Sequence, residues 1–158
     1  MYPMLIHPEK YCNKRKVITI RSSYEYMFAK FCDTNENVVS WSSEETIIPY
    51  YFPYVLKNNK KLKCNNKQRR YFMDFDIIII NKDGATERNL IEVKPYTQVI
   101  APKKPTPYSM FAYEKNIAKW NATKLFCEKL RNEKNENVYF KIITEQHLKE
   151  LSVGVNNE

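Results

Sequence analysis

Asp74, Glu92 and Lys94 are two carboxylates and an ammonium, residue types that together can form a metal site. Carboxylate oxygens are the ligands that Mg²⁺ and Mn²⁺ prefer, and a lysine ammonium can stabilise negative charge as it develops. Glu92 and Lys94 are two residues apart, so in a strand their side chains share one face. The pattern therefore predicts a metal site if Asp74 reaches the same face.

The segments around these residues predict a β-hairpin. The run from Tyr71 to Ile80 is aromatic and β-branched, as in a buried strand, and Asn81 to Gly84 contains the Asp-Gly pair of a tight turn. Asn89 to Lys94 predicts the returning strand. Facing residues of an antiparallel pair have a constant sum of numbers, here about 166 or 167, which places Asp74 opposite Glu92 or one step away.

A structural explanation of these charges is also open. A cross-strand charge pair contributes only about 0.2–1 kcal/mol and is common in sheets. Asp74 and Asp76, however, interrupt an otherwise hydrophobic strand, and an unpaired buried carboxylate is costly. A bound cation would remove that cost. Because Glu92 and Lys94 lie at the end of a strand, we expect their face to be wet and substitutions there to disturb folding little.

Composition predicts one domain that spans residues 1–158, with an extended N-terminal arm at 1–16 and a flexible tail at 153–158. The chain has 12 Tyr, 8 Phe and only two Gly, which excludes low-complexity and fibrous classes. No apolar run approaches the ~20 residues of a membrane span, so we expect no membrane partner. The four cysteines lack the spacing of a zinc site and are expected to be reduced thiols.

Positive charge is concentrated in one segment. The net charge is +8, and Lys57 to Arg70 contains seven basic residues and no acidic one; the remainder has 19 basic and 18 acidic residues. Such a patch suits a phosphate backbone. The alternative is a solvated loop in a sequence rich in Lys and Asn.

The order of predicted elements is α-β-β-β-α-β, which indicates an α/β fold with a mixed four-stranded sheet flanked by helices. The fourth strand follows a crossover helix and should run parallel to the third. A β-like run at 17–20 precedes these elements, and 96–107 is rich in proline and predicts a loop. The first predicted helix opens at Arg21 to Glu25, with Ser22 as its N-cap, and ends at 33–37. It is followed by a first strand with a bend over 38–52, the hairpin described above, a long helix capped by Ser109 or a neighbour and running to about 132, a strand at 138–143 and a short helix at 145–151.

Glu25 has two interpretations. Ser22 followed three residues later by Glu25 has the spacing of a capping box, which needs no further function. Alternatively, the Glu25 carboxylate faces the sheet and joins Asp74 and Glu92. The local sequence favours the first interpretation. Glu44 and Glu45 are expected to be solvated or to lie around the site.

The ordered set of motifs resembles the PD-(D/E)xK nuclease superfamily. Within it, the sequence is most similar to the head completion nucleases of T-even-like tailed phages, and it also resembles the TnsA family of transposase endonucleases. The matching blocks are RSSYE (21–25), NVVSWSSEETIIPY (37–50), RRYFMDFDI (69–77), IEVKP (91–95), APKKP (101–105), YEKNIAKW (113–120) and the pair Thr144-Glu145.

The resemblance implies a restriction-endonuclease-like αβββαβ core and assigns the site. It makes Glu25, Asp74, Glu92 and Lys94 catalytic, with Asp74, Glu92 and Glu25 as ligands of Mg²⁺ or Mn²⁺. Met73 stands where the superfamily name expects proline, and Asp76 is a reserve ligand. The residues expected to bind DNA are all basic: Arg21, Lys60, Lys61, Lys63, Lys67, Arg69, Arg70, Lys103, Lys104 and Lys119.

The function that the resemblance implies is a Mg²⁺-dependent endodeoxyribonuclease. It would trim DNA ends after packaging and act at the portal vertex before tail attachment, with double-stranded DNA and portal or neck proteins of a phage head as partners. It would be found in the virion, at the head-neck region, and in the host cytoplasm during assembly. Two rival functions are a TnsA-like transposase endonuclease subunit and a structural head-neck protein with a vestigial nuclease site.

Overall fold

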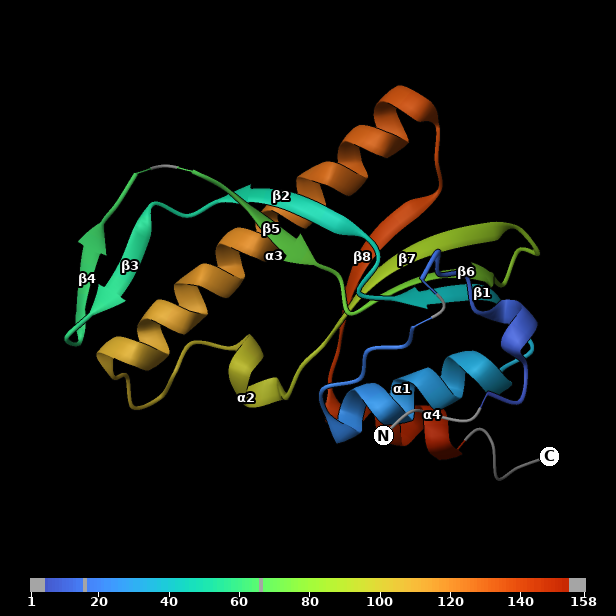
Figure 1. Ribbon diagram of the computed structural model, residues 1–158. Coiled ribbons are helices and arrows are strands. Elements are labelled where there is room, and N and C mark those ends of the chain that lie inside the picture. The colour runs from blue at the N-terminus through green and yellow to red at the C-terminus, as the bar shows by residue number, and fades with distance from the viewer. Residues whose placement is uncertain (1–4, 16, 66, 154–158) are drawn as a thin grey trace.

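The computed structural model describes residues 5–15, 17–65 and 67–153. Figure 1 shows helices on both sides of a twisted sheet, with a long two-stranded extension on one side. The elements are η1 (Pro8–Lys10), α1 (Ser23–Thr34), β1 (Val38–Ser43), β2 (Ile47–Tyr51), β3 (Tyr54–Lys57), β4 (Lys60–Lys63), β5 (Gln68–Phe72), β6 (Phe75–Ile80), β7 (Thr86–Val93), α2 (Tyr96–Val99), α3 (Pro107–Lys134), β8 (Val138–Ile143) and α4 (Glu145–Val153).

The central sheet has the strand order β1-β6-β7-β8. The pairs β1–β6 and β6–β7 are antiparallel, whereas β7 and β8 run parallel. The helix α3 supplies the crossover between β7 and β8, as a parallel pair requires. The series α1, β1, β6, β7, α3, β8 is therefore the predicted αβββαβ core with a mixed four-stranded sheet.

The hairpin was predicted correctly in its turn and register. Phe75 faces Ile91 and Asp76 faces Leu90, so the pair numbers sum to 166. At the turn, Gly84 adopts φ +75°, a conformation that glycine reaches without steric cost. The first strand of this hairpin, however, is shorter than predicted. The run 71–80 is not one strand, because it breaks at Met73 and Asp74 between β5 and β6.

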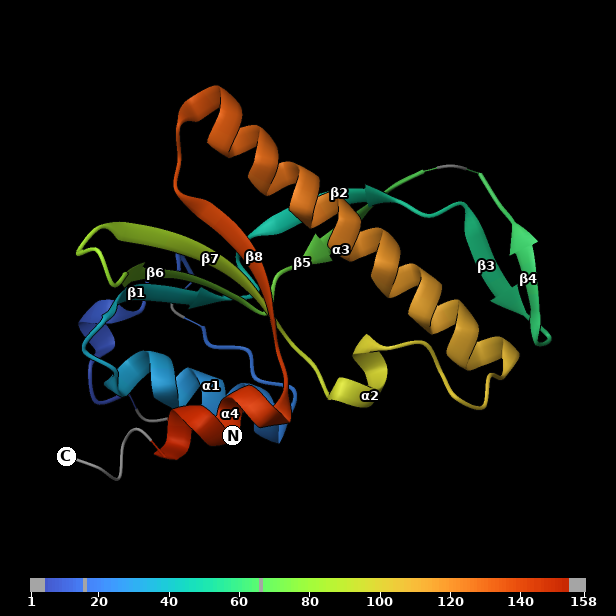
Figure 2. The ribbon, with the colours of Figure 1, turned by 180° about the vertical axis from the view of Figure 1, so that it is seen from behind.

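Residues 47–72 form an extension that we call the arm. In it, β2 pairs with β5 and β3 pairs with β4, which makes the basic segment a lengthened hairpin. Figures 1 and 2 show that the arm lies alongside the first half of α3 and carries the β3–β4 turn at its far end. The predicted bent strand over 38–52 is therefore two strands in different sheets, with the bend at Glu44, where φ is 48°.

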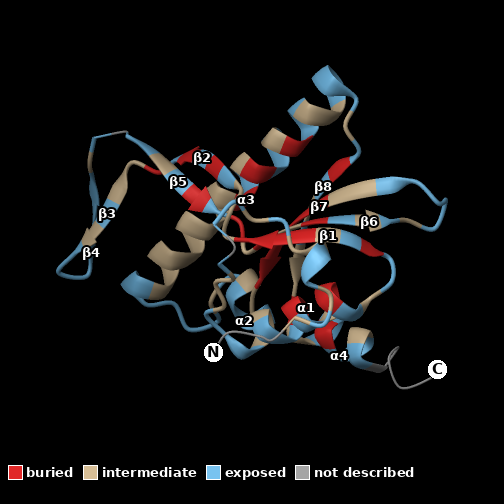
Figure 3. Cartoon of the chain, turned by 45° about the vertical axis from the view of Figure 1, so that its right-hand side comes forward, coloured by how far each residue is buried: buried red, intermediate tan, exposed pale blue. Residues whose placement is uncertain are grey.

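Two hydrophobic cores lie on the two faces of the central sheet. Phe75, Ile77 and Ile91 pack with Phe28 of α1 and Leu148 of α4. On the opposite face, the second core joins the sheet to α3 and to the arm, with these buried members: Ile48, Tyr50, Tyr71, Met73, Leu90, Trp120 and Val138. Figure 3 shows this burial concentrated where the arm meets the sheet. The arm is therefore anchored by a core of its own and extends from it toward solvent.

Several local predictions need correction. Residues 17–20 form no strand. The N-terminal segment 1–16 was predicted to be extended, but its residues 5–15 contain η1 and a β-bridge from Tyr11 to Trp41. The predicted loop at 96–107 contains the short helix α2, and α3 is capped by Thr106 instead of Ser109. Residues 154–158 of the predicted tail lie outside the described residues. Within the described part of the chain, no helix is long and apolar enough to cross a membrane.

Candidate active site

The break between β5 and β6 places Asp74 at the end of the sheet, beside the last residues of β7. The backbone N–H of Val93 donates a hydrogen bond of 2.7 Å to Asp74 Oδ2. Glu92 and Lys94 flank Val93, so the Glu92 carboxylate, the Val93 N–H and the Lys94 ammonium all lie at or directly after the end of β7. The predicted convergence of Asp74 and Glu92 at one end of two adjacent strands is present in the structure.

Glu92 is held by a donor on each carboxylate oxygen. Lys94 Nζ donates to Oε1 at 2.9 Å, and the Tyr71 hydroxyl donates to Oε2. Only 4% of Glu92 is exposed, so the expectation of a wet strand end was wrong. The cause is tertiary, because Tyr71 comes from the arm and α3 covers the same face of the sheet. The carboxylate is thus fixed in place by residues from two parts of the fold.

Negative charge exceeds positive charge around Asp74 and Glu92. The pKa of Asp74 is raised to about 8, first because the carboxyl is buried and then because Glu92 and Glu25 are negative; the Val93 hydrogen bond and Lys94 oppose this shift only in part. The same conditions raise the pKa of Tyr71, so its hydroxyl stays protonated as a donor to Glu92. Two carboxylates therefore share a buried position with one close lysine.

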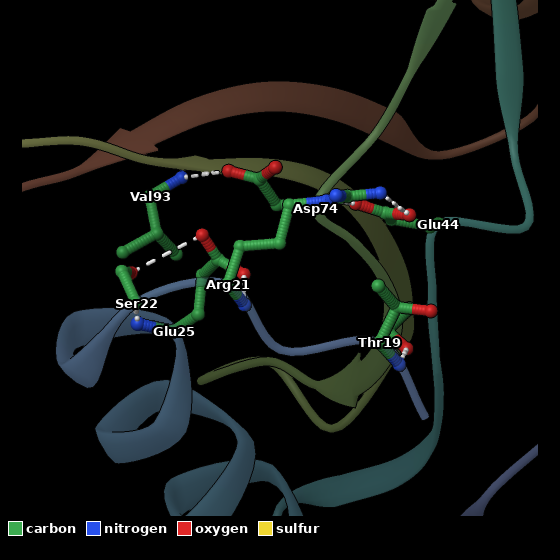
Figure 4. A network of polar contacts seen from close by, with 8 residues as sticks. Thr19, Arg21, Ser22, Glu25, Glu44, Asp74 and Val93 are labelled. Atoms are coloured by element: carbon green, nitrogen blue, oxygen red, sulfur yellow. Dashed lines mark hydrogen bonds and ion pairs between the residues drawn. The ribbon is translucent and has the colours of Figure 1, made fainter. Parts of the chain in front are cut away.

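Glu25 caps α1, which is the first of its two interpretations, and its charge also acts on the site. Ser22 Oγ accepts from Glu25 N at 3.1 Å, and Glu25 Oε2 accepts from Arg21 N at 2.8 Å, so Glu25 caps α1. Its charge also raises the pKa of Asp74. Figure 4 shows Glu25 and Asp74 on facing elements with Arg21 beside them. Glu25 therefore borders the carboxylate pair while its own oxygens bond to the helix cap.

Arg21 and Asp76, two further candidates, are engaged in ion pairs. Arg21 Nε lies 2.5 Å from Glu44 Oε1, so its guanidinium pairs with a carboxylate next to the site. Asp76 accepts two hydrogen bonds from Arg88, at 2.9 and 2.6 Å, and a third from Thr46. The oxygens of Asp76 are therefore occupied by its own neighbours, which makes Asp74 the better ligand candidate of the two.

The other predicted DNA-binding residues occupy two settings. Lys60, Lys61 and Lys63 lie on β4, Lys67 on the link to β5, and Lys103 and Lys104 in the loop before α3, all exposed. Arg70 stacks on Phe72 with 5.5 Å between its guanidinium carbon and the ring centroid. Lys119, by contrast, is half-buried and lies 5.2 Å from the centroid of the Tyr71 ring, one residue removed from Glu92. Arg69 is half-buried as well.

Sequence reasoning missed Tyr71 and Lys115. Tyr71 was interpreted only as part of a hydrophobic strand, and its contact with Glu92 depends on the break after β5. Lys115 lies one helical turn before Lys119, and burial together with Arg69 lowers its pKa. The spacing of these two lysines was a usable signal, because residues four apart share one face of a helix.

The chemistry of the donor set fits a divalent cation. Within the described residues, no group of three or more His, Cys, Asp or Glu side chains is arranged to hold a metal. Mg²⁺, however, is usually bound through one or two carboxylates and keeps several waters. The raised pKa of Asp74 reports excess negative charge that a cation would relieve. The number and type of carboxylates at Asp74 and Glu92 are thus compatible with a Mg²⁺ ligand set.

Comparison with known proteins adds two matches. The model of the family described as "TnsA-like endonuclease N terminal" matches residues 35–145, a range that contains Asp74, Glu92 and Lys94 but not Glu25. The chain is also similar to the head completion nuclease of Enterobacteria phage T4, with 31% identity over 154 residues, which covers 90% of this chain and 88% of that protein. The search of solved structures gave no match.

Proposed function

The chain belongs to the family of TnsA-like endonuclease N-terminal domains, and from this premise we propose that it is a DNA endonuclease that uses Mg²⁺ or Mn²⁺. Membership of this family and kinship with a phage nuclease support nuclease activity. The observation that carries the proposal is the buried pair Asp74 and Glu92, which lies beside Lys94 at the end of the sheet. An acidic pair with one close lysine is suited to hydrolysis of a phosphodiester.

The residues of the site would divide the chemistry among them. Asp74 and Glu92, with Glu25 nearby, would hold the divalent ion, which when bound polarises the scissile phosphate and activates water. Tyr71 fixes the orientation of Glu92 through its hydroxyl. Lys94 would release part of its contact with Glu92 and stabilise the negative charge that develops on the phosphate. Because Lys94 is partly buried, its ammonium would interact with the phosphate charge more strongly than it would in water.

We propose further that the substrate is double-stranded DNA at an end produced during phage head assembly. Kinship along 90% of the chain with a head completion nuclease supports this setting. In this proposal the protein trims DNA ends after packaging and works at the portal vertex before tail attachment. Its partners would be portal or neck proteins, first in the host cytoplasm and then in the head-neck region of the virion.

A transposase-type endonuclease subunit is the second candidate, and the family match over residues 35–145 favours it. Such a subunit would depend on a partner recombinase and cut at defined ends. The purified chain distinguishes the two functions, because an end-trimming nuclease cleaves DNA without such a partner. A structural head-neck protein with a vestigial site would not cleave at all.

Cleavage of supercoiled plasmid by the purified chain tests the proposal. We expect nicking or linearisation with Mg²⁺ or Mn²⁺, none with EDTA, and strong loss for Glu92→Gln. Asp83→Asn is the matched control, because Asp83 is an exposed acid in the β6–β7 turn. Absence of cleavage by the folded wild-type chain with either ion would overturn the proposal of a nuclease that acts alone. Cleavage that appears only with a partner recombinase would then favour the transposase-type subunit, and no cleavage with such a partner would favour the structural alternative.

A further inference from the structure

Three basic side chains, Arg69, Lys115 and Lys119, lie where the paired strands β2 and β5 of the arm pack on α3. Arg69 and Tyr71 are two apart on β5 and share the face that packs toward α3, a spacing of about 6.6 Å. Lys115 and Lys119 are one turn apart on α3, with a rise of about 6 Å. The residues of the two elements correspond in pairs. The charge of Arg69 lowers the pKa of Lys115, so these two cations are neighbours, and Lys119 lies over the Tyr71 ring.

These cations are crowded and have no anionic partner. Among the described residues, no carboxylate forms an ion pair with Arg69, Lys115 or Lys119. The partners of Arg69 are uncharged: it donates to the Tyr54 carbonyl oxygen at 3.1 Å and weakly to Cys64, and it interacts with the Tyr50 hydroxyl. Burial lowers the pKa of both lysines, and the charge of Arg69 lowers that of Lys115 further. At Lys119 the negative charge of Glu92 opposes the effect of burial in part, while Lys94 and Lys115 add to it. Half-buried cations without partners cost free energy, which an external anion would recover.

The row leads directly to the candidate active site. Lys119 stacks on the Tyr71 ring, the Tyr71 hydroxyl donates to Glu92, and Lys94 donates to the other oxygen of Glu92. The order along the surface is therefore Arg69 and Lys115, then Lys119, then the acidic pair. The charge changes from positive to negative at the position where a metal ion would bind.

We propose that Arg69, Lys115 and Lys119 form a track for the phosphate backbone of the DNA strand that is cut, with Lys119 at the phosphate next to the scissile one. This inference rests on the proposed function and specifies how the substrate reaches the site. Double-stranded DNA carries one phosphate per ~3.4 Å of rise on each strand, so cations about 6 Å apart can contact the same strand. The track differs from the exposed lysines of β4, which are farther out on the arm.

Metal-free binding of the full chain to a labelled DNA duplex over a range of KCl concentrations tests the track. The double variant Lys115→Met/Lys119→Met keeps the aliphatic stems and removes two charges. We expect weaker binding and a salt slope that falls by about 1.8, or 0.9 per lost phosphate contact. The matched control is Lys124→Met/Lys129→Met, two exposed lysines on the same helix, which should keep the wild-type slope.

Stability separates a binding role from a structural one. Because the removed charges are half-buried and unpaired, the thermal midpoint of the inner double variant should hold or rise while its DNA affinity falls. Lys119→Arg keeps the charge and should retain the wild-type slope. If the inner variant keeps the wild-type slope, or if both double variants lower it equally, the track is wrong. Failure of the wild-type chain to bind the duplex would overturn it as well.

The cleavage assay distinguishes failure of the track from failure of the proposed function. If the slope falls as expected but the wild-type chain does not cleave with Mg²⁺ or with Mn²⁺, the track stands and the nuclease proposal fails. If the wild-type chain cleaves and the slope is unchanged, the reverse holds. At saturating DNA, Lys119→Met should cleave about tenfold more slowly, because it loses a cation next to the reacting phosphate, whereas the control Lys124→Met should keep the wild-type rate. Equal rates for Lys119→Met and the wild type would remove Lys119 from the position next to the scissile phosphate.

Discussion

The end of the central sheet and the arm differ in the sign of the charge that lacks a partner. At the sheet end, Asp74 and Glu92 are buried with one close lysine, and Glu25 adds negative charge from α1. In the arm, the ionisable side chains from Lys57 to Arg70 that carry charge are all basic. Lys61 of this segment forms an ion pair with Glu114 of α3. One region lacks cations, and the other lacks anions.

This difference in charge indicates that the two regions bind different partners. A buried acidic pair suits a metal ion, whereas an extended row of cations suits a polyanion. Tyr71 joins the two regions, because it belongs to β5 of the arm and donates to Glu92 of the sheet. We therefore expect the sheet end to carry out catalysis and the arm to bind DNA. The following predictions test this assignment of the two functions.

The largest effect is expected when the sheet end loses its chemistry. Glu92→Gln and Lys94→Met should each reduce the cleavage rate by about 10²–10³, the usual cost of one well-placed electrostatic group. DNA affinity without metal should hold or rise for Glu92→Gln, because a negative charge near the phosphate is gone. The measurements are cleavage rate at saturating DNA and metal-free affinity. Wild-type rates in both variants would show that the chemistry lies elsewhere.

Glutamine is the informative substitution because Glu92 is buried. Glu92→Ala would leave the Tyr71 hydroxyl and Lys94 without their acceptor, and a buried donor without a partner costs about 1–3 kcal/mol. Loss of activity in Glu92→Ala would then mix chemistry with unfolding. The thermal midpoint of each variant, measured beside the wild type, separates the two effects.

The second effect is a dependence of stability on pH that comes from Asp74. Its pKa in the folded state, about 8, lies above the usual value of 3.8, so the folded chain holds the proton longer than the unfolded chain. Metal-free stability should therefore fall by several kcal/mol as pH rises from about 4 to about 8, because each unit of pKa difference corresponds to about 1.4 kcal/mol. Asp74→Asn should remove that part of the fall and be the more stable protein at pH 8.

Thermal unfolding of the wild type and Asp74→Asn over this pH range makes the measurement. Asparagine can still accept the hydrogen bond from Val93 N, so the variant tests charge more than geometry. Added Mg²⁺ should restore wild-type stability at pH 8 and have little effect on the variant. Parallel pH curves for the two proteins would contradict the account of the acidic pair.

The third effect concerns the residue that joins the two regions. Tyr71→Phe removes the hydroxyl that holds Glu92 and should slow cleavage about tenfold, equivalent to about 1.4 kcal/mol. Stability should fall by about 1–3 kcal/mol, because Glu92 is buried and loses a donor. Tyr51→Phe is the matched control: this arm tyrosine is exposed, and its hydroxyl accepts only a long hydrogen bond, 3.3 Å, from Gln68. Equal losses in the two variants would show that Tyr71 has no special link to the site.

Local sequence was sufficient for the features that depend on neighbouring residues. The Asp83-Gly84 turn determined the hairpin register, and Ser22 with Glu25 predicted the start of α1. The register could also have revealed the ion pair of Asp76, because Arg88 is a diagonal neighbour across β6 and β7. These predictions succeeded because turns, caps and strand pairs are decided within a few residues or by counting from a turn.

Features that depend on distant segments could not be predicted in this way. The run 71–80 has one composition, and its division into β5 and β6 follows from the pairing of β5 with β2. Glu92 is buried because Tyr71 and α3 cover it, although its strand position alone suggested a wet site. Lys115 was overlooked because a lysine on a helix is usually solvated, and its burial arises only where α3 meets the arm.

The smallest effect is expected at the far end of the arm, where the cations are exposed. Lys60→Met should lower the salt slope of duplex binding by about 0.9 or less and leave cleavage at saturating DNA unchanged. Lys61→Met should lower it less than Lys60→Met, because Lys61 is already engaged by Glu114 at 3.0 Å and by the Tyr54 ring. Glu114→Gln releases Lys61 and should tighten DNA binding slightly, since an exposed ion pair contributes only about 0–1 kcal/mol. If Lys60→Met instead stops cleavage at saturating DNA, the arm takes part in the chemistry and the division between the two regions is wrong.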